Sequence, residues 1–124
     1  MNEFQAGVRK FHEKYNGLVN DLPTMVNDDR LLLRSRLIVE EAGEFLKAAS
    51  QHNMVEMCDA LADLLYVTYG TGVELGVDLE PIFTEVQRSN MTKDGGGHDT
   101  SGKIQKGPDF EEPDIIGELS KQGW

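Results

Sequence analysis

The sequence predicts an all-α protein of the four-helix-bundle type, and three features of the chain support this fold class. Residues 30–50 and 54–75 each carry apolar side chains at helical spacing, and only the three residues 51–53 separate them. A turn this short joins antiparallel helices, and such hairpins build four-helix bundles. Shorter segments at 3–14 and 79–91 repeat the pattern, and 124 residues suffice for one domain with a core.

Turn and capping residues set the helix boundaries. Asn16-Gly17 ends the first helix, and the stretch 18–26 is a connector that could also touch a ligand or a partner chain, although a plain linker is favoured. The segment 27–29 supplies an N-cap for the second helix, and Asn53 can cap the third, with Glu56 at the position of a capping-box partner. Pro81 suits the first turn of a fourth helix.

The composition changes after Lys93. We therefore expect a helical unit over residues 1–93 and a tail over 94–124 that packs on it, with a flexible glycine-rich loop at 95–102, irregular chain at 103–113 and a helical turn or two at 114–122. The loop matches most of a phosphate-binding P-loop. Ile104 stands where that motif needs Ser or Thr, and no strand precedes it, so we set this reading aside.

The charge of the chain narrows its partners. A net charge of −10 argues against binding a nucleic-acid polymer or an anionic membrane surface, and means that a polyphosphate substrate needs a divalent cation to mask repulsion. The single cysteine, Cys58, excludes an internal disulfide framework and suits a reducing compartment. The N-terminal residues lack an apolar signal core, and no apolar run has the ~20 residues of a membrane span, so we expect a cytoplasmic protein.

Six carboxylates fall on the two central helices, where apolar residues would be expected to pack. No Lys or Arg occurs between Lys47 and Arg88, so the acids of the third helix have no basic partner on their own helix. Buried carboxylates without counter-charges need protonation or a metal ion. We therefore interpret them as a metal site; they are Glu40, Glu41, Glu44, Glu56, Asp59 and Asp63.

Residues equidistant from His52 should lie level in the hairpin. Glu41 is then level with Asp63, and Glu44 with Asp59 or its neighbour, whereas Glu56 lies one turn away and suits a capping role. Asp59 and Asp63 are four residues apart and share a helix face. The predicted metal ligands are thus Glu41, Glu44, Asp59 and Asp63, with Glu40 beside them.

An all-oxygen cluster selects a hard cation, Mg²⁺ or Mn²⁺. A di-iron bundle site would need Glu-x-x-His pairs, which the sequence lacks. Salt bridges are the alternative: Arg36 could pair with Glu40, and Lys47 with Glu44. Nothing local serves the two aspartates of the third helix, so a metal is favoured.

With these residues placed, the sequence resembles the all-α nucleoside-triphosphate pyrophosphohydrolases, the MazG-like and phosphoribosyl-ATP-pyrophosphohydrolase-like superfamily. The segment 40–44 matches the family's Glu-Glu-x-x-Glu motif, and 63–78 resembles its next helix and exit. The segment 83–93 resembles its phosphate-contacting segment, and 106–108 a recurrent tail motif. The family also has Glu-x-x-Asp on the second of these helices, and here the residue three before Asp63 is Ala60.

Two alignments follow from this departure. In the preferred one Asp63 is the family's aspartate and Asp59 stands in for the missing glutamate. In the other, Asp59 is that aspartate, Glu56 fits the spacing, and the role of Asp63 is in doubt.

The resemblance implies Mg²⁺-dependent hydrolysis of a nucleoside triphosphate, of the deoxy series, to the monophosphate and pyrophosphate. Glu40 would orient the attacking water or accept its proton, and Asn90 and Lys93 would hold phosphate oxygens. A non-catalytic nucleotide-binding module and an oligomerisation bundle with a structural ion remain as alternatives. The resemblance, together with a third helix too apolar for its neighbours to cover, implies a homodimer or homotetramer.

Overall fold

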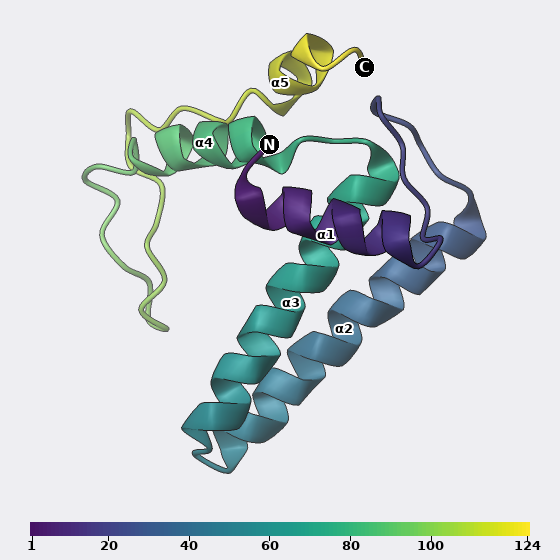
Figure 1. Cartoon of the computed structure of the whole chain (residues 1–124). Coiled ribbons are helices and arrows are strands. Elements are labelled where there is room, and N and C mark those ends of the chain that lie inside the picture. Colours follow the sequence, from purple (N-terminus) through teal and green to yellow (C-terminus); the bar gives the residue numbers. More distant parts are fainter.

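The computed structural model describes residues 1–124 and contains five helices and no strand, so the predicted all-α fold is confirmed. A long antiparallel hairpin of α2 and α3 forms the body of the molecule, and α1 crosses α3 near its C-terminal end (Figure 1). The second helix begins two residues earlier than expected. The helices are α1 (Glu3–Lys14), α2 (Asp28–Ser50), α3 (Met54–Leu75), α4 (Leu79–Asn90) and α5 (Ile115–Lys121).

Asparagine caps begin both helices of the hairpin. The side chain of Asn27 accepts a hydrogen bond from the amide of Arg30 at 2.9 Å, and that of Asn53 accepts one from the amide of Glu56 at 3.1 Å. The amide of Asn53 donates to Ala48 O at 3.1 Å, not to the Glu56 side chain. Of the two hydrogen bonds of the expected capping box, only the one from the Glu56 amide to the Asn53 side chain forms.

Glycines at the C-terminal end of α3 make room for other parts of the same chain. A Cβ atom on Gly70 would lie 2.5 Å from the Arg34 guanidinium. Gly76 ends α3 with a φ of 68°, a left-handed cap conformation, and a Cβ there would lie 2.1 Å from the carbonyl oxygen of Leu22. These two glycines are thus explained by contacts inside one chain.

The core of the single chain is small. Only 12 of its 124 residues are buried, and the apolar ones among them are Val8, Val26, Ala48, Ala60 and Val73. Within one chain the principal neighbours of α3 are α1 and α2, and these leave one side of the helix uncovered. Large apolar side chains such as Leu61 and Leu65 remain exposed.

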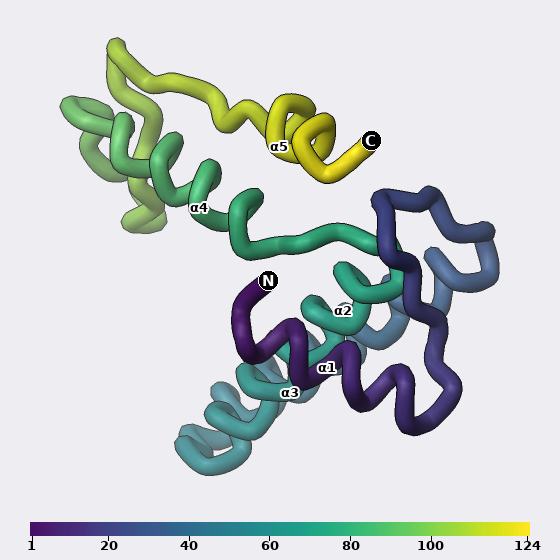
Figure 2. Tube along the Cα trace, turned by 45° about the horizontal axis from the view of Figure 1, so that its top comes forward, coloured from purple at the N-terminus to yellow at the C-terminus, as the bar shows by residue number.

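The tail packs along α4. Gln122 of the C-terminal segment accepts a hydrogen bond from the amide of Asp78 at 2.8 Å and donates one to its carbonyl at 2.9 Å, and the hydroxyl of Ser89 donates to Glu111 O at 2.7 Å. The main helix contacts of α4 are with α5, and the two together lead away from the hairpin (Figures 1 and 2). None of the helices combines the length and apolarity that a bilayer crossing requires.

Candidate metal centre

A buried ion pair fixes how α2 and α3 are aligned. Arg30 and Glu74 are equidistant from His52, and both Nε and Nη2 of Arg30 lie 2.8 Å from Oε1 of Glu74. Arg34, one turn on, donates from Nη1 to Oε2 of Glu74 at 2.8 Å and from Nη2 to Val67 O at 2.9 Å. This contact confirms the rule that residues equidistant from His52 lie level.

The same alignment brings the predicted acids together around Glu41. Its carboxyl group is half-buried, and desolvation raises its pKa above the usual value. The negative charges of Asp63, Glu40, Glu44 and Asp59 raise that pKa further, in this order. Of the two acids between which the sequence left a choice, Asp59 is among the charges with the largest effects on this pKa.

No basic side chain neutralises this cluster. The ion pairs of the chain lie elsewhere, and neither Arg36 nor Lys47 forms one with the neighbouring glutamates. The salt-bridge alternative is therefore not realised. The expectation of buried acids is wrong for four of the five, because Glu40, Glu44, Asp59 and Asp63 are exposed on this single chain.

The donor chemistry of the cluster fits a divalent cation. Its ligands are all carboxylate oxygens, and a hard cation such as Mg²⁺ or Mn²⁺ prefers oxygen. Glu41 carries the repulsion of four like charges, which a bound cation would relieve. As the side chains stand, no three of them come close enough together to hold an ion. They are exposed and free to change rotamer, so a cation would have to draw them in.

The two residues predicted to hold phosphate do not reach this cluster within one chain. Asn90 is exposed at the end of α4, and Nζ of Lys93 lies 5.9 Å from the centre of the Phe110 ring. Nζ of Lys106 lies 4.8 Å from the same ring. No lysine is among the charges that act on Glu41, and α4 leads away from the hairpin (Figure 1).

Sequence reasoning overlooked the network around Glu74. The side chain is fully buried, it lies on a helix without basic residues, and it is level with Arg30, so the rule that aligned the acids would also have found it. Its role is to join the helices that carry the carboxylates. Thr71 adds to it, because its hydroxyl accepts a hydrogen bond from Arg34 Nε at 3.1 Å.

The fold and the cluster define a class of protein: an all-helical domain with unpaired carboxylates on facing sides of an antiparallel hairpin. The chain belongs to the phosphoribosyl-ATP pyrophosphohydrolase family, whose pattern it matches over residues 8–90, within the MazG-like all-α superfamily.

A viral protein shares part of this sequence. The uncharacterized protein L479 of Acanthamoeba polyphaga mimivirus is 43% identical over 54 residues, which are 44% of this chain. The match spans 22% of the viral protein, so the two chains correspond over a small part of its length.

Proposed function

We propose that this protein hydrolyses a nucleoside or deoxynucleoside triphosphate to the monophosphate and pyrophosphate, with Mg²⁺ or Mn²⁺ as cofactor. One observation carries the proposal: four other carboxylates lie around Glu41 and none of the five has a basic partner, in a member of a pyrophosphohydrolase family. A strongly acidic protein repels a triphosphate unless a divalent cation lies between them.

The residues take the following roles. Glu41, Glu44, Asp59 and Asp63 would hold the cation, which when bound would neutralise charge on the phosphates and help to activate water. Glu40 orients the attacking water and accepts its proton. The water oxygen bonds to the α-phosphorus, the bond between that phosphorus and the bridging oxygen breaks, and pyrophosphate leaves.

A second copy of the chain would supply Asn90 and Lys93. These residues do not reach the acids of their own chain, and the exposed apolar residues of α3 are available for assembly. We therefore propose a homodimer or homotetramer in which each acidic cluster faces the α4 end of another copy. Loss of Lys93 should weaken substrate binding more than metal binding, because a protonated lysine cannot ligate a cation.

We also propose a cytoplasmic role in cleaning the nucleotide pool. An exposed single thiol at Cys58 suits a reducing compartment. The family name points to phosphoribosyl-ATP as another substrate. A product assay can distinguish hydrolysis of phosphoribosyl-ATP from hydrolysis of a nucleoside triphosphate.

The test is a panel of the common nucleoside and deoxynucleoside triphosphates together with phosphoribosyl-ATP, with released pyrophosphate measured against added Mg²⁺. We expect pyrophosphate from at least one triphosphate and none after chelation of the metal. Release of pyrophosphate from phosphoribosyl-ATP and from none of the triphosphates would show that the proposed substrate is wrong and that phosphoribosyl-ATP is the substrate. Nucleotide binding without any release would overturn the enzymatic proposal.

A further inference from the structure

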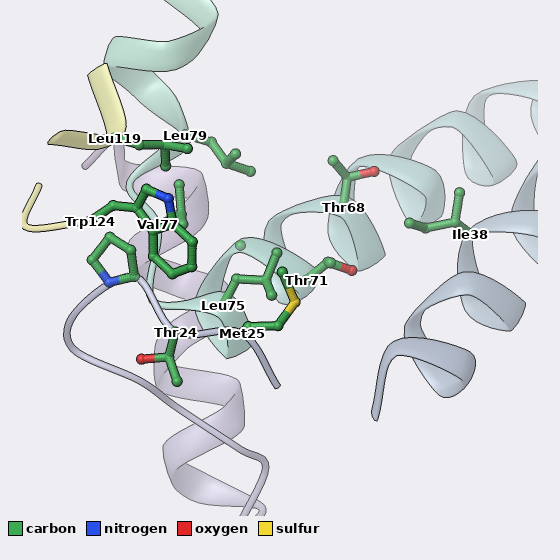
Figure 3. A pocket seen from close by; sticks show the side chains of 12 residues that line it. Thr24, Met25, Ile38, Thr68, Thr71, Leu75, Val77, Leu79, Leu119 and Trp124 are labelled. Atoms are coloured by element: carbon green, nitrogen blue, oxygen red, sulfur yellow. The ribbon is translucent and has the colours of Figure 1, made fainter. Parts of the chain in front are cut away.

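The apolar pocket beside the C-terminal end of α3 has no charge to offer the phosphates of a nucleotide. It has a volume of about 340 Å³ and lies where the connector before α2 and the tail meet α3 (Figure 3). Met25, Leu75 and Trp124 are among its lining residues, none of which is charged. Because phosphates bind best to cationic donors, their partners have to be sought among the basic side chains elsewhere.

A second lysine shares the aromatic ring that Lys93 approaches. Nζ of Lys106 lies 4.8 Å from the centre of the Phe110 ring, and Nζ of Lys93 lies 5.9 Å from it. The two ammonium groups can therefore be no farther apart than these two distances combined. The face of the ring attracts both cations, whereas the cations repel each other. An anion between them would relieve that repulsion, as a divalent cation would relieve the repulsion around Glu41.

Hydrogen bonds to the end of α4 hold this part of the tail in place. The hydroxyl of Ser89, a residue only 2% exposed, donates to Glu111 O at 2.7 Å. The amide of Glu111 donates to Thr92 Oγ1 at 2.9 Å. Phe110 directly precedes Glu111, and Lys93 directly follows Thr92. The ring and the first lysine are thus each next to an anchored residue, so the fold itself brings them together.

Two glycines allow the segments that carry the lysines to touch along their backbones. A Cβ atom on Gly107 would clash with the carbonyl oxygen of Asp94, and one on Gly96 would clash with that of Gln105. In the first of these contacts, the residue before each partner is a lysine of the pair. The close approach of the two segments therefore also places the two lysines on the same ring.

The acids beside the pair do not saturate it. Lys93 forms no ion pair, and Nζ of Lys106 lies 3.0 Å from Oε1 of Glu112, with the two side chains 60% and 72% exposed. An ion pair this exposed is weak, so a phosphate chain with several charges can displace Glu112. Asp94 and Asp109 are exposed and unpaired, and they lower the positive potential nearby. Binding therefore depends on direct contact with the ammonium groups.

We infer that Lys106 is a second phosphate-binding residue and that, together with Lys93, it holds the end of the triphosphate that leaves as pyrophosphate. The inference rests on the proposed function, since it takes Lys93 to bind the phosphates of the substrate. A lysine beside the α-phosphate would compete with the cation for the carboxylates around Glu41. The lysines therefore suit the β- and γ-phosphates, and the tail becomes part of the active site.

Binding of the two products separates the ends of the substrate. Lys106→Met keeps the length of the side chain over Phe110 and removes its charge. Calorimetry in the presence of Mg²⁺ should show pyrophosphate bound roughly tenfold more weakly or worse, as expected for loss of a charge-assisted hydrogen bond, and KM for the triphosphate should rise with it. The nucleoside monophosphate, which lacks the β- and γ-phosphates, should bind as it does to the wild type.

Two further variants serve as controls. Lys103→Met removes an exposed lysine of the same loop that forms no ion pair, and should leave pyrophosphate binding unchanged. An equal loss in Lys103→Met and Lys106→Met would overturn the inference, because general positive charge would then explain both. Lys106→Arg restores the charge and should restore binding, which excludes a folding defect as the cause of the loss.

Glu112→Gln gives a test of opposite sign. It frees Lys106 from its ion pair, so pyrophosphate should bind up to about fivefold more tightly. Weaker binding would mean that the ion pair serves only the fold of the tail, and would overturn the inference. Unchanged pyrophosphate binding and KM in folded Lys106→Met would overturn it as well, with the proposed function intact. Absence of turnover by the wild type would overturn the proposed function instead.

Discussion

Glu41 is the residue at which the electrostatic cost of the cluster is concentrated. Desolvation and four neighbouring carboxylates all raise its pKa, and it forms no ion pair with a basic side chain. In a protein without metal such a site destabilises the fold, because like charges repel. A bound divalent ion would attract each carboxylate and so outweigh the repulsion between them. Substitution of Glu41 should therefore affect stability in opposite directions, depending on whether the residue binds a metal ion or serves the fold through a salt bridge.

Glu41→Gln keeps the length of the side chain and removes one charge. We expect pyrophosphate release to fall by orders of magnitude, while the melting temperature without metal stays equal to that of the wild type or rises. The increase of melting temperature on adding Mg²⁺ should shrink. Near-normal turnover in the folded variant would contradict the metal site.

Glu56→Gln is the matched control on α3. Its carboxylate is exposed and is not one of the predicted metal ligands, so activity should persist. Asp59→Asn should behave like Glu41→Gln. If Glu56→Gln also abolished activity, Glu56 would be the family's glutamate and Asp59 its aspartate, as in the second alignment of the family motif.

At the scale of elements, the ion pairs of Glu74 join α2 to α3 beside the contact of α1. The Glu74 side chain is fully buried, and that of Arg34 is 10% exposed. Glu74→Gln leaves two guanidinium groups without their carboxylate, and breaking a buried pair costs about 3–5 kcal/mol. Urea denaturation should show a loss of this order in the free energy of unfolding. Lys121→Met, which removes an exposed partner of Glu118, should lower the free energy of unfolding far less than Glu74→Gln does.

Glu85 joins α4 to the start of α5. Its carboxylate accepts hydrogen bonds from Arg88 Nη2 at 2.8 Å and from the amide of Asp114 at 3.1 Å, and these bonds lower its pKa to about 2. Because the folded pKa is below the unfolded one, the contribution to stability is present above the unfolded value near 4.5 and is lost as the pH falls toward 2.

Glu85→Gln should therefore melt at a lower temperature than the wild type at pH 7, and the difference should disappear as the pH approaches the folded pKa of about 2. Melting curves at a series of pH values measure it. A difference that stays constant between neutral and acidic solution would mean that the charge of Glu85 contributes nothing.

For the whole molecule, one chain leaves both its apolar surface and its proposed site incomplete. Mixing two inactive variants tests whether copies complete each other. Glu41→Gln and Lys93→Ala, mixed in equal amounts and allowed to exchange subunits, should recover roughly a quarter of wild-type activity in a two-fold dimer, because half of the dimers then hold one intact site. Each variant alone should stay inactive or weak. No recovery after demonstrated exchange would place both residues in the same chain's site.

The sequence was sufficient for the helices and for the alignment of the hairpin. Helical spacing and asparagine caps depend on neighbours in the chain, and the distance from His52 aligns Glu41 with Asp63 as it aligns Arg30 with Glu74. The direction of α4 could not be predicted, because it depends on a left-handed Gly76 packed against Leu22 and on the distant Gln122 bound to Asp78. The sequence also indicated that the neighbours of α3 would not cover it, but an apolar helix does not say which chain covers it instead.

The ties that hold the hairpin to the rest of the molecule are all at one end. Asn20 donates to the carbonyl of Glu74 at 2.6 Å and Gln5, on α1, donates to Val77 O just after α3 at 2.7 Å, and the ion pairs that join α2 to α3 through Glu74 lie at the same end. Toward the turn at residues 51–53 only the small side chains of Ala48 and Ala60 are buried, among exposed apolar side chains and repelling acids. Amide hydrogen exchange should therefore be slow at residues 67–75 and faster near the turn. Mg²⁺ should slow exchange around residues 41–63, which makes the loose half of the hairpin a local sensor of metal binding.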